Sequence, residues 1–137
     1  MRQVIADIVK IEKDFYSEVV LGQPNGDYCR WILKSDSWGG AIELAILSDF
    51  YEIEICAFDI KSTRMDRYGE DKKYSNRIYL LYDGIHYDAL AFSPLEETLE
   101  YEDLDVTVFS VDDFNMQAKA RDVVKQINKV RIEIILN

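Results

Sequence analysis

The sequence has few of the residues on which disulfide-rich and metal-dependent small proteins rely. Its 137 residues include two cysteines, two prolines and one histidine. Two cysteines are too few for a disulfide framework, and one histidine with two separated cysteines gives no zinc-ligand spacing. The chain shows no signal-peptide pattern and no long apolar run. We therefore expect a protein of a reducing compartment, cytoplasmic and also compatible with the nucleus, that uses no metal and no cofactor.

Positive charge is also scarce, with 16 basic residues against 26 acidic ones and a formal net charge of −10. An acidic surface repels phosphate groups, so nucleic acid and anionic membranes are not expected partners. The same charge favours basic partners, although acidity more often serves solubility alone.

What the sequence does contain is enough apolar material for a core, since 48% of its residues are hydrophobic. With no linker-like stretch, no repeat and no low-complexity segment, residues 1–137 are predicted to form a single domain. The first half reads as helices. An amphipathic pattern covers residues 1 to about 15, and Asp27 is placed to cap a short helix. Residues 41–47 are apolar on nearly every side, so residues 41–50 are predicted to form the most buried helix.

The second half reads as a small sheet followed by a helix. Residues 53–60 and 77–82 are rich in β-forming side chains, and the polar segment 64–74 between them is interpreted as a connection. Asp83-Gly84 predicts a tight hairpin turn into a third strand over 86–92. Residues 96–105 are expected to be loop, 106–111 a short strand, 114 to about 128 a helix, and 131–136 a final strand or a frayed end. The order of elements gives an α+β fold.

The only histidine, His86, follows this turn, and Asp88 lies two residues further on, which places both side chains on one side of a strand. A carboxylate beside an imidazole orients it, as in a Cys-His-Asp constellation. From spacing alone an ordinary structural pair is the commoner explanation. No nucleophile accompanies the pair, because neither Cys29 nor Cys56 follows a glycine turn at a helix start. Both are expected to be reduced, buried thiols.

Four ordered segments together resemble the OTU family of cysteine deubiquitinases: YCRWI at 28–32, WGGAIE at 38–43, DRYGED at 66–71 and LYDGIHYD at 81–88. The branch that they resemble most has an N-terminal ubiquitin-like adaptor and a C-terminal zinc finger, and works with an AAA ATPase in ER-associated degradation. The resemblance implies a papain-like fold with a small mixed β-sheet flanked by helices.

The resemblance also implies roles for individual residues. His86 would be the general base and Asp88 the orienting group. Tyr82, Gly84 and Ile85 would meet the C-terminal tail of ubiquitin or polyubiquitin. Glu43 would belong to the ubiquitin surface, or else be a buried carboxylate bonded to nearby amides, which is the role that we favour.

The family's nucleophile lies in an Asp-x-x-Cys motif upstream of the point that matches Met1. We therefore expect an N-terminally truncated OTU domain that is inactive without that motif. The alternative is a non-catalytic module that binds ubiquitin or another partner. The absent helix would leave an apolar face beside His86, which predicts a homodimer through that face.

Overall fold

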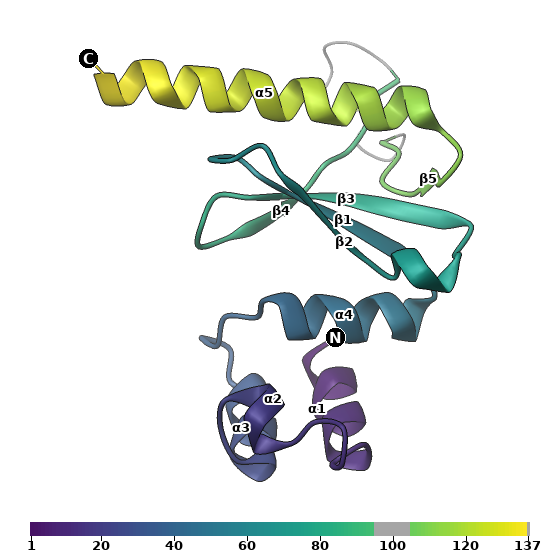
Figure 1. Ribbon diagram of the computed structural model, residues 1–137, viewed down its shortest axis with the longest axis vertical. Helices are drawn as coiled ribbons and strands as arrows, with labels where there is room; N and C mark the ends of the chain where they lie inside the picture. The colour runs from purple at the N-terminus through teal and green to yellow at the C-terminus, as the bar shows by residue number, and fades with distance from the viewer. Residues whose placement is uncertain (95–104, 137) are drawn as a thin grey trace. The chain divides into compact units, whose positions relative to one another are not determined.

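The computed structural model describes residues 1–94 and 105–136, and these form two compact units, Met1–Tyr51 and Glu52–Asn137. Figure 1 traces the chain from the helices of the first unit to the sheet and long helix of the second. Within the expected single domain, each unit has its own hydrophobic cluster. Among the described residues, no helix has the length and apolar character needed to cross a bilayer.

The first unit is helical throughout, with α1 at Arg2–Ile11, α2 at Glu18–Leu21, α3 at Asn25–Ile32 and α4 at Ala41–Tyr51. Its core joins α1 and α3 and consists of Ile5, Ala6, Val9, Leu21, Tyr28, Ile32 and Ile46. The prediction that the first helix runs to about residue 15 is wrong. The helix ends at Ile11. The side chain of Asn25 donates to the carbonyls of Val9 and Tyr16, each at 2.9 Å, and thereby provides a hydrogen-bond donor for a carbonyl in the last turn of α1.

Two further expectations for the first unit need correction. The helix α3 begins directly after Pro24, so Asp27 is not its cap but lies in its first turn, where it pairs with Arg30. The helix α4 forms as expected, but it is not uniformly enclosed. Its buried residues are Glu43, Ile46 and Ser48, while Phe50 and Tyr51 are exposed. Three buried residues are no more than α1 has, so α4 is not the most buried helix.

The second unit is built on a mixed sheet in the order β2-β1-β3-β4, with β5 paired to β3. The strands are β1 at Glu54–Asp59, β2 at Met65–Tyr68, β3 at Asn76–Tyr82, β4 at Tyr87–Ala89 and β5 at Phe109–Ser110. The pair β1–β3 is parallel, whereas β1–β2, β3–β4 and β3–β5 are antiparallel. This sheet with its helices confirms the predicted α+β class.

The segment 64–74, expected to be a connection, contains the edge strand β2 and a short 3-10 helix, η1, at Glu70–Lys72. An edge strand pairs on one side only and needs no continuous apolar face. The polar sequence of β2 therefore gave no strand signal. The predicted strand over 86–92 is shorter, ending at Ala89, and Phe92 instead forms an isolated bridge with Val106. The loop expected at 96–105 falls almost wholly outside the described residues.

The helix α5 runs over Phe114–Leu136, so residues 131–136 are neither a strand nor a frayed end. It lies along one face of the sheet (Figure 1). Its Val124 is fully buried in a cluster with Cys56, Phe58, Tyr79 and Phe109. Elongating a helix fixes one residue for each added hydrogen bond, whereas starting a new strand needs a partner, which explains why the isoleucine-rich end continues α5.

Candidate active site

The single histidine lies in the tight turn between β3 and β4. Asp83 donates its amide to the His86 carbonyl at 3.2 Å. Its side-chain Oδ1 accepts the amides of Ile85 and His86, each at 2.8 Å. The hydrogen bonds from these two amides, that from His86 first, lower the pKa of the Asp83 carboxyl. One residue therefore fixes the backbone on both sides of the turn.

Two tyrosines and a glycine complete the turn. Gly84 has a φ of +107°, a backbone conformation that favours glycine. The Tyr82 hydroxyl donates to the Gly84 carbonyl at 2.8 Å, and the rings of Tyr82 and Tyr87 stack with centroids 4.5 Å apart. The tight turn predicted from Asp83-Gly84 is confirmed, and the two rings brace its two ends.

The predicted pair of His86 and Asp88 is present on this turn. The imidazole Nδ1 lies 3.2 Å from Asp88 Oδ1, at the long end of the hydrogen-bonding range. Their side chains are 54% and 63% exposed, respectively. The expectation that His86 is partly exposed at a strand end with Asp88 nearby is confirmed.

The pair has the arrangement that a general base needs. With Nδ1 directed to the carboxylate, Nε2 is the nitrogen that can take a proton from a nucleophile. The carboxylate also stabilises the imidazolium that forms when the proton is taken. The exposure of both side chains allows a substrate to reach them, and the braced turn keeps the ring from being displaced.

Residues of α5 form one wall of a groove beside this turn, and the sequence analysis did not predict this groove. An open groove of about 850 Å³ is lined by Ile60, Asp83, Ile85, Gln126, Ile127, Val130 and Arg131. Ile85 is 70% exposed and lies on the turn side, while Val130 lies on the helix side. The groove escaped prediction because the helix was expected to end near residue 128. A helical reading of 123–131, where Val123, Ile127 and Val130 recur at helical spacing, would have found it.

The structure places the other predicted site residues in two locations. Tyr82, Gly84 and Ile85 share the turn with His86, as their spacing requires. Glu43 lies in the first unit and is only 8% exposed. It accepts hydrogen bonds from the Tyr28 hydroxyl and, at 2.6 Å, from the Gly40 amide. Burial, and next the Glu43 carboxylate, raise the pKa of the Tyr28 phenol. These surroundings match the structural role favoured for Glu43, and its part in a binding surface stays a prediction.

Neither cysteine has the surroundings of an activated nucleophile. Cys56 is fully buried in β1, with Sγ 3.1 Å from Glu54 Oε1. Burial, and then the Glu54 carboxylate, raise the pKa of its thiol to about 12, which disfavours the reactive thiolate. Cys29 lies in α3 and is half-buried, with Sγ 3.6 Å from the Ala6 carbonyl. Both are thiols as expected, but only Cys56 is fully enclosed.

A second cluster of charged groups lies where β1 and β3 begin. Glu54 and Arg77 are register partners, 5% and 2% exposed, and are joined at 2.8 Å. Arg67 of β2 adds contacts of 3.1 and 3.2 Å to the same carboxylate. Gln117 of α5 accepts from Arg77 at 2.6 Å. These contacts pair the buried charges with one another inside the unit, so we interpret the cluster as structural, although Arg77 Nε has no hydrogen-bond partner among the described residues. In the described part of the chain, no three His, Cys, Asp or Glu side chains converge as metal ligands.

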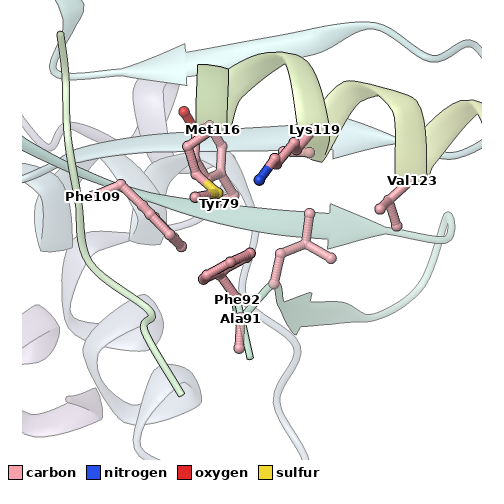
Figure 2. A pocket seen from close by; sticks show the side chains of 9 residues that line it. Tyr79, Ala91, Phe92, Phe109, Met116, Lys119 and Val123 are labelled. Atoms are coloured by element: carbon pink, nitrogen blue, oxygen red, sulfur yellow. The ribbon is translucent and has the colours of Figure 1, made fainter. Parts of the chain in front are cut away.

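A second pocket lies between α5 and the sheet, and Figure 2 shows its lining side chains. It holds about 120 Å³ and is bounded mainly by apolar groups such as Phe92, Phe109 and Met116. The Lys119 ammonium lies 5.0 Å from the centroid of the Phe92 ring. The pocket has room for a group of about the size of one benzene ring. Of its lining residues only Lys119 and Tyr79 carry titratable groups, and no histidine or carboxylate lines it that would activate either one. The histidine turn is therefore the better candidate for chemistry.

Similarity to known proteins identifies the family of the chain. No family model matches the chain. It is 52% identical over 111 residues to OVARIAN TUMOR DOMAIN-containing deubiquitinating enzyme 2 of Arabidopsis thaliana, covering 81% of this chain and 52% of that protein. It is 49% identical over 126 residues to ubiquitin thioesterase OTU1 of Dictyostelium discoideum, with 92% of this chain and 38% of the relative covered. The human ubiquitin thioesterase OTU1 is 45% identical over 132 residues, with 96% and 36% covered.

The chain thus spans about half or less of the length of these relatives. Among solved structures, it matches an ovarian tumor (OTU) domain in complex with ubiquitin with a TM-score of 0.81 and 30% sequence identity. That match covers 94% of this chain and 70% of the solved one. Sequence and fold agree, and the chain belongs to the OTU family of deubiquitinases.

Proposed function

We propose that this chain forms the histidine-bearing part of a cysteine-type OTU deubiquitinase. The observation that carries the proposal is the His86–Asp88 pair, 3.2 Å apart on a braced and exposed turn of an OTU fold. In this mechanism His86 takes the proton of a thiol and Asp88 holds the imidazole in place. The thiolate then attacks the carbonyl carbon at the C-terminus of ubiquitin, and the imidazolium returns the proton to the leaving amine.

Recognition of ubiquitin is proposed for the same turn. Tyr82 and Gly84 hold the turn that carries Ile85, and Ile85 presents an exposed apolar side chain beside His86. The similarity to an OTU domain in complex with ubiquitin supports this assignment. For Glu43 we retain a contribution only through the shape of the first unit, since its carboxylate is engaged with Tyr28 and Gly40.

A second candidate function is a module that binds ubiquitin or another partner without cutting it. It is favoured by the surroundings of Cys56, whose thiol is fully buried and has a pKa raised to about 12. In this case residues 1–137 hold ubiquitin or another partner, and no nucleophile is used.

The cellular setting is also a proposal. Two unpaired cysteines fit a cytoplasmic or nuclear location. The family resemblance supports work with an AAA ATPase in ER-associated degradation. The exposed Ile85 and Val130 would give a homodimer an apolar contact near the turn.

The first experiment measures binding. Titration of the 137-residue protein with ubiquitin should shift the single imidazole signal in the NMR spectrum. Ile85→Ala should weaken the affinity by about five- to tenfold, as expected for one buried anchor at an interface. Ile11→Ala is a matched control, because Ile11 is 81% exposed and lies in the first unit. An imidazole signal that does not respond to a large excess of ubiquitin would refute the enzyme and the ubiquitin-binding module, and would leave only a module for another partner.

The second experiment separates the enzyme from the binding module. The protein is assayed on a fluorogenic substrate carried on the ubiquitin C-terminus while its mass in solution is measured. We expect no turnover above background from residues 1–137, because neither thiol is activated. Turnover that Cys29→Ser abolishes would make Cys29 the nucleophile. Turnover that survives replacement of both cysteines would reject the thiol mechanism. A protein that stays monomeric at high concentration would refute the proposed homodimer.

A further inference from the structure

The helix α5 is tied by one side chain to the segment that follows β1. The side-chain Nδ2 of Asn128 donates to the Ile60 carbonyl at 2.7 Å and to the Lys61 carbonyl at 3.0 Å. A primary amide has two N–H groups, so one nitrogen can serve both acceptors. Asparagine is a poor helix former, and in the interior of this 23-residue helix its cost is offset by these two contacts.

The segment held by Asn128 is bonded in turn to the strand that carries the histidine turn. The Ile60 amide donates to the Tyr82 carbonyl at 3.0 Å, which extends the parallel ladder one step past Asp59 and Tyr82. Ile60 itself is buried, with 7% of its surface exposed. The 60–61 peptide therefore has α5 on one side and the last residue of β3 on the other.

The same segment also approaches the turn through side chains. A Cβ added at Gly84 would lie 3.5 Å from Lys61 Nζ and 3.7 Å from Lys61 Cε. Ile60, Asp83 and Ile85 together line one groove with the helix residues on either side of Asn128. Movement of residues 60–61 away from α5 would thus disturb the turn at Tyr82 and beside Gly84.

We propose that Asn128 is a positioning residue for the His86 turn, acting through the Ile60 and Lys61 carbonyls. This rests on the proposed function, because the turn needs a fixed place only if His86 acts on a substrate. Asn128 does not touch the imidazole, and its effect passes through Ile60 to Tyr82 and from there to the Asp83–His86 backbone.

The test compares Asn128→Asp and Asn128→Ala with the wild-type protein by NMR hydrogen exchange without ubiquitin. Aspartate has the same shape but donates no N–H, so it repels the two carbonyls. We expect exchange of the Ile60, Ile85 and His86 amides to become about tenfold faster, which matches the loss of two hydrogen bonds of ordinary strength. The imidazole signal of His86, the single histidine, should move as well. Asn115→Ala, which removes an exposed asparagine near the start of the same helix, is the control and should change neither.

Two outcomes would overturn the proposal. The first is exchange at Ile60, Ile85 and His86 that stays at the wild-type rate in Asn128→Asp. The second is exchange that rises equally in the middle of β1 and β3, which would mark a general loss of stability. Because ubiquitin is absent, this result is independent of the binding experiment. A wild-type protein that fails to bind ubiquitin refutes the proposed function while the exchange data still decide the role of Asn128.

Discussion

Each end of the parallel pair β1–β3 has a basic side chain beside a carboxylate, but the surroundings of the two ends are opposite. At the beginning of the strands, Glu54 and Arg77 are almost fully buried and joined at 2.8 Å. Past the other end, His86 and Asp88 are more than half exposed and lie 3.2 Å apart. A buried pair is important for stability, because loss of one partner leaves the other charge buried and uncompensated. An exposed pair contributes little to stability and stays accessible to a substrate. Exposure, and not the pairing of a basic side chain with a carboxylate, distinguishes the end of the sheet for which we propose the chemistry.

The largest expected effect comes from breaking the buried pair. Arg77→Met should lower the free energy of unfolding by about 3–5 kcal/mol, because the buried Glu54 carboxylate then keeps Arg67 as its only positively charged partner among the described residues. Chemical denaturation followed by circular dichroism measures this loss. Arg64→Met is the control, because Arg64 pairs with Asp66 at an exposed site. A loss below about 1 kcal/mol would mean that the two ends do not differ as described.

The next effect concerns the thiol inside the buried end. In the native protein a thiol reagent should label Cys56 on the order of a hundredfold more slowly than the half-buried Cys29. Full burial and the Glu54 carboxylate both raise the pKa of the Cys56 thiol, which lowers the fraction present as the reactive thiolate. The measurement is labelling over time, with each site identified by mass spectrometry. Equal rates would show that the buried end opens readily.

The pH dependence of stability gives a smaller effect. Burial acts to raise the pKa of Glu54, but hydrogen bonds from Arg67 and Cys56 and the charge of Arg77 outweigh it, and the pKa lies below the ordinary 4.5. A lowered folded-state pKa contributes stability above pH 4.5 that is lost as the pH falls through the folded value. The stability difference between the wild type and Glu54→Gln should therefore be constant near neutrality and narrow in acid. A difference that widens below pH 4.5 would contradict the sign.

The smallest effect on stability is expected at the exposed end. Asp88→Asn should change the free energy of unfolding by less than about 0.5 kcal/mol, since exposed pairs contribute little. The imidazole signal of His86 should nevertheless shift, because its Nδ1 loses a charged neighbour. A stability loss comparable to that of Arg77→Met would assign the exposed pair a structural role instead.

Local signals in the sequence predicted the histidine turn and the central strands well. Asp83-Gly84 encodes the turn by itself, and the β-rich runs around Ile55 and Ile78 become the parallel centre of the sheet. The strand β2 could not be found in this way, because it is held by β1 and not by an apolar pattern of its own.

The groove wall was missed for a related reason. Whether residues 131–136 continue a helix depends on the segment before them, since their isoleucines suit either structure. The support from Asn128 was equally out of reach, because its two acceptors lie 68 and 67 residues away in the sequence.

The hairpin between β3 and β4 has a consequence for the order of folding. His86, Asp88 and the Asp83 contacts that shape the turn all fall within six residues, from 83 to 88. Hairpins of this kind close within microseconds, whereas the parallel pairing of Asp59 with Tyr82 must first bring distant segments together. The relation of imidazole to carboxylate can thus be established before the sheet is complete. Later pairing of β1 with β3 would then position the hairpin with its His86–Asp88 pair already formed.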